Sequence, residues 1–106
     1  MNDLMRPSLY SARHKIENLV ESSEKKDLYS VVGPVCETAD SFGSDFEVSA
    51  NAGDYLVVYS VGAYGSSMGS NYNTRLKPAE ILVDQKSHKV IRKAETFDDL
   101  IKEEEL

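Results

Sequence analysis

The sequence predicts a mostly β domain with short helices near its two ends, and three observations support this fold class. The apolar stretches are short and rich in β-branched and aromatic residues, which is typical of strands. Clusters of Gly, Pro, Asn and Asp separate these stretches, as turns do. The 106 residues suffice for one small core, so we expect residues 1–106 to form a single domain.

The first element is expected around Pro7, because a proline suits the first turn of a short helix. Arg6 then stands as the extended residue that precedes a proline. Arg6 and Tyr10 are four positions apart and would share one face if the turn continues. Taken alone, Arg6 is equally well explained as a solvated surface cation.

Two strands are expected next. Residues 16–20 are apolar enough for a strand that ends before a polar loop over residues 21–27. Residues 28–32 are β-branched and aromatic, and they predict a second strand whose last residues, Val31 and Val32, are buried.

The second strand is broken by Gly33-Pro34, and the only cysteine of the chain, Cys36, follows with Glu37 beside it. A lone thiol is more often a buried filler than a functional group. A carboxylate beside a buried thiol, however, requires a polar partner or solvent. We therefore expect polar or ligand-like groups near this turn, and a continuing loop over residues 41–44.

Residues 55–61 form the most apolar stretch and are predicted to be the central strand. The stretch ends at residues 62–65, where glycines flank Tyr64, let a ligand approach the backbone and leave the phenol uncrowded. A structural tyrosine corner is the competing interpretation. Residues 66–75 are polar and varied, which predicts a structured surface loop.

The last third of the chain predicts a hairpin and a helix. Residues 79–84 and 88–92 have the composition of two strands joined by a turn at residues 85–87. Thr96 can cap a last helix that runs from Phe97 to the end of the chain and carries acidic residues in its first turn.

Composition excludes several classes of function. The net charge of −6 disfavours nucleic acid as a partner. A single cysteine excludes an internal disulfide framework and suits a reducing compartment. The longest apolar run, about seven residues, is far short of a membrane span, and no signal-peptide pattern is present. We therefore expect a cytoplasmic protein that does not bind membranes.

Neither a metal site nor a complete catalytic set is expected. His14 and His88 lack a second ligand at metal spacing, and both are expected to be surface or hydrogen-bonded histidines. The glycines do not match a phosphate-binding loop. No nucleophile with its base and orienting group can be recognised either.

Five ordered motifs nevertheless identify a family. They stand in the order and approximate spacing of the C-terminal part of diaminopimelate decarboxylases, and the resemblance covers essentially the whole chain. The motifs are Arg6-Pro7-Ser8-Leu9-Tyr10, Gly33-Pro34-Val35-Cys36-Glu37, Gly62-Ala63-Tyr64-Gly65, Asn71-Tyr72-Asn73-Thr74-Arg75 and Glu95-Thr96-Phe97-Asp98-Asp99-Leu100.

The resemblance implies a pyridoxal-phosphate lyase of the alanine-racemase-like fold. Such an enzyme has an N-terminal (β/α)8 barrel and a C-terminal domain that is β-barrel-like or sandwich-like, and this chain resembles only the second part. The barrel, with its Schiff-base lysine and phosphate site, has no counterpart in the chain. Small departures from the family pattern are Thr38 in place of serine, and Ser60-Val61 in place of an acidic residue and alanine.

The resemblance also implies a role for each site residue. Cys36 resembles the proton donor, and Glu37 a contact to the substrate ammonium group. Arg6 and Tyr10 resemble substrate contacts, and Tyr64 a contact to both substrate and cofactor. These roles suit diaminopimelate, because a guanidinium can hold the distal carboxylate while a carboxylate pairs with the distal ammonium.

The implied partners are diaminopimelate, the barrel domain and a second subunit, since in this family the cysteine and glutamate act across a homodimer interface. Relatives that act on simple diamines typically carry aspartate after the cysteine and lack the Arg-Pro pair, so Glu37 and Arg6 favour diaminopimelate. Two alternatives remain: a non-catalytic regulatory or scaffold β domain, and the matching part of an ornithine or arginine decarboxylase. Under any of these, we expect the chain alone to be inactive.

Overall fold

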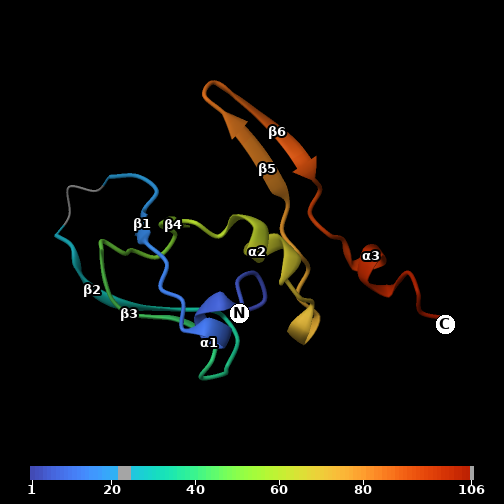
Figure 1. Cartoon of the computed structure of the whole chain (residues 1–106), viewed down its shortest axis with the longest axis horizontal. Helices are drawn as coiled ribbons and strands as arrows, with labels where there is room; N and C mark the ends of the chain where they lie inside the picture. The colour runs from blue at the N-terminus through green and yellow to red at the C-terminus, as the bar shows by residue number, and fades with distance from the viewer. Residues whose placement is uncertain (22–24, 106) are drawn as a thin grey trace.

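The structure is a computed structural model that describes residues 1–21 and 25–105 (Figure 1). Short strands predominate, and short helices lie near both ends, so the predicted mostly β fold class is confirmed. In chain order the elements are α1 (Arg6–Tyr10), β1 (Ile16–Asn18), β2 (Asp27–Val32), β3 (Ser41–Val48), β4 (Leu56–Val58), α2 (Gly62–Ser67), the 3-10 helix η1 (Tyr72–Thr74), β5 (Glu80–Asp84), β6 (Ser87–Arg92) and α3 (Phe97–Ile101). The predicted polar loop falls partly on residues 22–24, which lie outside the described residues.

The strands pair in three separate antiparallel ribbons. β1 pairs with β4, β2 with β3, and β5 with β6. Within the described ranges every paired strand has a single neighbour, so these strands close no barrel. Two-stranded ribbons are marginal in water unless they pack on something else, which makes the small core decisive for stability.

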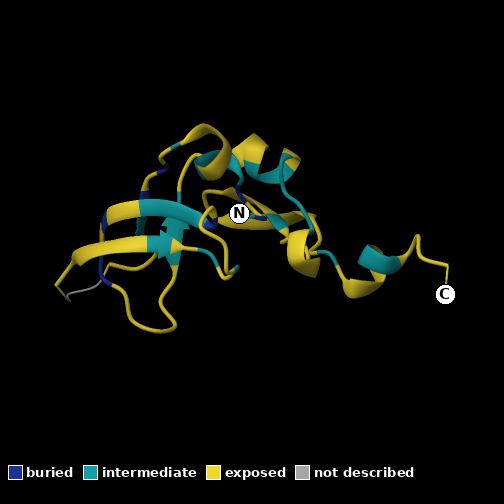
Figure 2. Cartoon of the chain, turned by 90° about the horizontal axis from the view of Figure 1, so that it is seen from below, coloured by how far each residue is buried: buried dark blue, intermediate teal, exposed yellow. Residues whose placement is uncertain are grey.

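The core lies where α1, β1 and β3 meet. Its buried apolar residues are Leu4, Ile16, Phe46 and Val48. In Figure 2 the buried segments of the ribbon are dark blue. Phe46 and Val48 are two positions apart on β3 and therefore share its inner face. The Arg13 guanidinium lies 4.6 Å from the centre of the Phe46 ring and covers it.

The longest strand, β3, was not predicted. Its first half was expected to continue the loop, because Ser, Gly and Asp are turn residues. In the structure these residues bend the strand without ending it. Gly43 has φ 115° and Asp45 has φ 62°, and the β2–β3 register shifts nearby. A bulged strand of this kind keeps pairing while its local sequence has the composition of a turn.

The predicted central strand over residues 55–61 is wrong. Only Leu56–Val58 form β4, which pairs on one side with β1 and is half-buried. Ser60 has φ 58° and ends the extended stretch. A continuous apolar run normally indicates burial on both faces, but β4 has only β1 beside it among the described strands, and all three of its residues are half-buried.

Three smaller expectations are also corrected. Residues 62–67 form the helix α2, although glycine and serine have low helix propensity. Val32 is 65% exposed, because β2 has only β3 beside it, so the predicted buried strand end is wrong. Arg6 is the first residue of α1 and not an extended residue before it; Pro7 does occupy the first turn, as predicted.

The predictions for the last third of the chain are confirmed. β5 and β6 form an antiparallel hairpin with Asp84 opposite Ser87. α3 starts at Phe97, and Thr96 caps it: the Thr96 hydroxyl accepts from the Asp99 N–H, and the Asp99 carboxylate accepts from the Thr96 N–H at 2.9 Å. The helix ends at Ile101, earlier than expected.

The two histidines differ. His14 is buried, and its Nδ1 lies 3.0 Å from the carbonyl oxygen of Tyr59. Its Nε2 is buried and makes no hydrogen bond. His14 is therefore not a surface residue, and only one of its two ring nitrogens is hydrogen-bonded as expected. His88 is exposed on β6.

Residues 1–21 and 25–105 offer neither a membrane-spanning helix nor a metal-binding cluster. No helix in the described part of the chain is long and apolar enough to cross a membrane. The same residues contain no group of three or more His, Cys, Asp and Glu side chains placed to hold a metal ion.

Candidate functional site

The turn that carries Cys36 and Glu37 joins β2 to β3 and is built around Asp40. Asp40 is buried, and its Oδ2 accepts a hydrogen bond from the N–H of Val35 at 2.8 Å. Its backbone carbonyl accepts from the Gly33 N–H, also at 2.8 Å. A Cβ on residue 33 would lie 2.2 Å from Asp40 Oδ2, so any larger residue would have to displace the buried Asp40 carboxylate.

These bonds place Cys36 and Glu37 at the outside of the turn. The Glu37 N–H bonds to the Val35 carbonyl at 2.8 Å, and the Asp40 N–H bonds to the Glu37 carbonyl at 3.0 Å. The thiol of Cys36 is exposed, so burial as a filler, which the sequence alone favours, is wrong. The interior of the turn is occupied by the Asp40 carboxylate instead.

The surroundings of Asp40 favour its charged form. A hydrogen bond from the amino group of Met1 lowers the pKa of the Asp40 carboxyl, and the Val35 N–H lowers it further, against the opposing effect of burial. A lowered pKa means that this ionised carboxylate stabilises the turn above its ordinary pKa. That contribution is lost as the pH falls through the lowered value.

Glu37 has a partner that the sequence did not suggest. The hydroxyl of Tyr72, at the start of η1, donates a hydrogen bond to Glu37 Oε1. This bond raises the pKa of the Tyr72 phenol, and the negative charge of Glu37 and the partial burial of the phenol add to the effect. The expected polar group near the Cys36 turn is therefore a tyrosine.

Arg6 and Tyr64 form a second pair. Arg6 begins α1, Tyr64 lies in α2, and the guanidinium carbon of Arg6 is 4.9 Å from the centre of the Tyr64 ring. A guanidinium stacked by its flat face keeps its N–H edges free for a carboxylate. Tyr10 closes α1 four residues after Arg6 and is 61% exposed.

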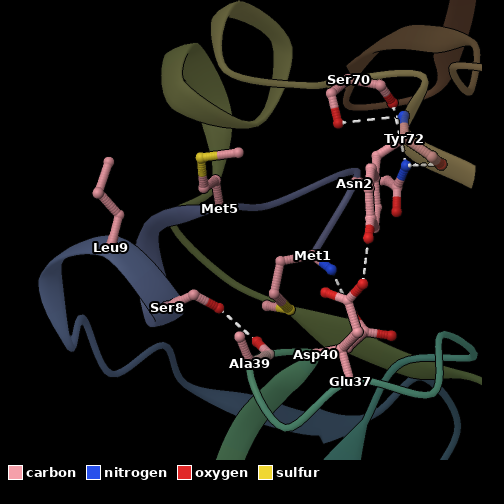
Figure 3. Close-up of a pocket in the computed structure, with 10 residues that line it drawn as sticks. All are labelled: Met1, Asn2, Met5, Ser8, Leu9, Glu37, Ala39, Asp40, Ser70 and Tyr72. Carbon is pink, nitrogen blue, oxygen red and sulfur yellow. Dashed lines mark hydrogen bonds and ion pairs between the residues drawn. The ribbon is translucent and has the colours of Figure 1, made fainter.

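A pocket of about 260 Å³ lies between α1, the Cys36 turn and the loop before η1 (Figure 3). Glu37 and Tyr72 line it from two sides, and Ser8 and Leu9 line it from α1. The Ser8 hydroxyl bonds to the carbonyl of Ala39, which ties α1 to the turn. Arg6 and Tyr64 are not among the residues that line this pocket.

The structure thus joins some predicted site residues and leaves others apart. Glu37 lines the pocket, and Cys36 is its neighbour in the turn. Arg6 and Tyr64 meet as a separate pair on α1 and α2, and Tyr10 is exposed at the end of α1. Sequence reasoning missed Tyr72 and Asp40 as parts of the site. The signal for Tyr72 was its place in a conspicuous Asn-Tyr-Asn motif.

One observation bears on the cofactor that the resemblance implies. A Cβ built on Gly62, two residues before Tyr64, would meet no atom within 4 Å, so the start of α2 faces open space. The Tyr64 side chain is 54% exposed beside it. This arrangement leaves open space for a ligand beside the Tyr64 ring.

Comparison with known proteins identifies the class. Residues 1–62 match the family described as the C-terminal sheet domain of pyridoxal-dependent decarboxylases. Because this match covers more than half of the chain, the chain belongs to that family.

Particular relatives are diaminopimelate decarboxylases. The enzyme of Neisseria meningitidis serogroup B is 50% identical over 99 residues, which are 92% of this chain and 24% of that protein. The enzyme of Haemophilus influenzae is 48% identical over 101 residues, or 94% of this chain and 24% of that protein. The crystal structure of the M. jannaschii enzyme with L-lysine superposes with a TM-score of 0.92 at 42% identity, covering 100% of this chain and 24% of that one. The chain therefore spans about a quarter of the length of these relatives.

Proposed function

We propose that this chain is the C-terminal part of a diaminopimelate decarboxylase, a pyridoxal-phosphate enzyme that converts meso-2,6-diaminopimelate to L-lysine and CO₂. The observation that carries the proposal is the similarity to diaminopimelate decarboxylases over more than nine-tenths of the chain. All five sequence motifs are present, including Glu37 and the Arg6-Pro7 pair.

In this proposal the residues of the chain divide the work on the substrate. Arg6 holds the distal carboxylate through its free N–H edges, and Glu37 pairs with the distal ammonium. Tyr10 and Tyr64 contact the substrate, and Tyr64 also contacts the cofactor. When bound, pyridoxal phosphate supplies the electron sink for the charge left after CO₂ departs. Cys36, exposed at its turn, gives a proton to the α-carbon.

The proposal includes parts outside this chain. Residues 1–106 act as one domain, next to an N-terminal barrel that supplies the Schiff-base lysine. The complete enzyme is a cytoplasmic homodimer in which Cys36 and Glu37 act in the active site of the second subunit. The exposed apolar side chains of the chain support such neighbours, because they need cover. Without the barrel, the chain has no decarboxylase activity.

The test is a chimera in which this chain replaces the matching quarter of the Haemophilus influenzae enzyme. The chimera should decarboxylate diaminopimelate, and Cys36→Ala should lower kcat by a factor of about 10² to 10⁴ with little change in KM. Thr38→Ala, in the same turn, is the matched control and should leave kcat unchanged.

Two outcomes would overturn the proposal. A folded chimera that contains the cofactor but releases no CO₂ from diaminopimelate would favour the scaffold alternative. A chimera that prefers ornithine or arginine would favour the diamine-forming alternative. Arg6→Ala further separates the diaminopimelate proposal from the diamine-forming alternative. If the proposal holds, this substitution should cost about 2–4 kcal/mol of discrimination between diaminopimelate and substrates without the distal carboxylate.

A further inference from the structure

The contact between Tyr72 and Glu37 joins two loops that are far apart in sequence. The Tyr72 hydroxyl reaches across the pocket from the start of η1 and bonds to Glu37 Oε1, on the turn between β2 and β3 (Figure 3). The two residues are 35 positions apart. Neither the turn nor η1 produces this contact by itself.

Tyr72 is held by a buried side chain. Asn2 is only 6% exposed, and its Nδ2 donates to the Tyr72 carbonyl at 2.6 Å and to the Ser70 carbonyl at 3.3 Å. In return, the Ser70 N–H bonds to the Asn2 carbonyl at 3.0 Å. The backbone from which the phenol extends is therefore fixed on both sides of residue 71.

The Glu37 side chain has the opposite character. Its backbone is fixed by the turn, but its carboxylate extends from the exposed outside of that turn. A flexible glutamate in solvent samples many rotamers, and ordering it for a ligand costs conformational entropy. A donor on a fixed backbone reduces that cost, because it selects one rotamer before the ligand arrives.

We propose that Tyr72 is a positioning residue for Glu37, which it holds through Oε1 so that Oε2 can receive the distal ammonium group of the substrate. The inference rests on the proposed function. It deepens that function by naming the residue that prepares the ammonium subsite.

The charges agree with this role. An ionised carboxylate offers about four acceptor positions on its two oxygens, so one bond to Oε1 leaves Oε2 available. The same bond raises the pKa of the Tyr72 phenol, so the hydroxyl keeps its proton and remains a donor at neutral pH. Phenol and ammonium can then donate to the two oxygens together.

A purely structural bond between the two loops is the competing explanation. Variants of Tyr72 and Glu37 separate this explanation from the positioning role. Tyr72→Phe removes only the hydroxyl and keeps the ring that lines the pocket. In the chimera, Tyr72→Phe should raise KM for diaminopimelate on the order of tenfold, the effect of one hydrogen bond to a charged group, with kcat within about twofold. An α-aminodicarboxylic acid of the same length without the distal amino group should show no such change. Tyr55→Phe, which removes another exposed hydroxyl, is the matched control.

A double-mutant cycle tests the dependence on Glu37. In the Glu37→Gln background, Tyr72→Phe should have little further effect on KM, because the charged acceptor is already gone. In the 106-residue chain itself, Glu37→Gln should lower the pKa of Tyr72 toward its ordinary value of 10.0, followed by NMR of the labelled phenol.

The inference is overturned by a Tyr72→Phe enzyme with unchanged KM, by an equal loss on both substrates, or by an undiminished loss in the Glu37→Gln background. An unmoved Tyr72 titration would likewise overturn it. These failures differ from failure of the proposed function, which would appear as a wild-type chimera without activity on diaminopimelate.

Discussion

The body of the molecule, residues 1–75, and its arm, residues 76–105, have similar apolar content in their strands but are held in different ways. In the described part of the chain, all buried residues lie between Asn2 and Ser49. The arm is the β5–β6 hairpin with α3, and Figure 1 shows the hairpin projecting away from the body. Ile81, Leu82 and Val83 are 46%, 55% and 71% exposed.

This difference shows what an apolar strand sequence does and does not establish. Neighbouring residues on β5 point to opposite faces, so the exposure of all three means that both faces of the ribbon are uncovered. The radius of gyration is 15.8 Å, whereas a compact domain of this length has about 13 Å. The sequence of the arm is suited to burial, and we infer that the cover comes from outside this chain.

The sharpest test of the difference between body and arm replaces one phenylalanine in each region by alanine and compares the loss of stability. Phe46 is 5% exposed in the body, and Phe97 is 56% exposed in the arm. Phe46→Ala should lower the free energy of unfolding by about 3–5 kcal/mol through loss of burial and creation of a cavity. Phe97→Ala should change it by less than about 0.5 kcal/mol. Urea denaturation of both variants measures this, and equal losses would mean that the arm shares the core.

A second pair of variants tests how tightly the site turn is packed. Gly33→Ala places a Cβ 2.2 Å from Asp40 Oδ2 and should destabilise the chain by about 1–3 kcal/mol. Gly62→Ala is the matched control, because its Cβ would meet nothing within 4 Å. Thermal unfolding compares the two. If Gly33→Ala is tolerated as well as Gly62→Ala, the Asp40 turn is looser than the structure shows.

The elements that sequence predicted correctly depend on local chemistry. The β5–β6 hairpin follows from two β-branched runs around a short turn, and α3 follows from Thr96 with an acid three residues later. β3 and α2 were missed because Gly43 and Asp45, and the glycines of α2, have the composition of loops. Tertiary pairing decided those elements, and no local pattern records it.

The candidate site shows the same limit. Cys36 and Glu37 stood out because the only cysteine of the chain has a carboxylate beside it at the end of an apolar run, and Arg6, Tyr10 and Tyr64 were given roles through the family resemblance. Tyr72 could not be assigned a role, because its contact with Glu37 exists only when two distant loops meet. Asp40 was missed for a related reason: its carboxylate acts by filling the interior of a turn.

The exposed faces of the arm should make the isolated chain self-associate. Val83→Lys, on the hairpin, should shift the chain toward the monomer with a change in unfolding free energy of less than about 0.5 kcal/mol. Leu28→Lys is the matched control in the body, since Leu28 is 68% exposed on β2. Sedimentation over a range of concentrations gives the result. An equal effect of both substitutions would show that the arm is no special contact surface, and a monomer at all concentrations would contradict the expectation outright.

The smallest expected effect concerns the end of the arm, where α3 depends on its cap more than on packing. Thr96→Ala removes the hydroxyl that accepts from the Asp99 N–H and should cost α3 about 1 kcal/mol of local stability. Hydrogen bonds from the Thr96 hydroxyl and N–H lower the pKa of the Asp99 carboxyl below 3.8. The cap is therefore fully formed above that ordinary pKa and is lost as the pH falls through the lowered value. NMR of the α3 amides during acid titration should show this loss, and Asp99→Asn should remove the pH dependence. An acid transition of α3 that persists in Asp99→Asn would mean that another carboxylate, such as Asp98 in the same turn, and not the Asp99 cap, controls the helix.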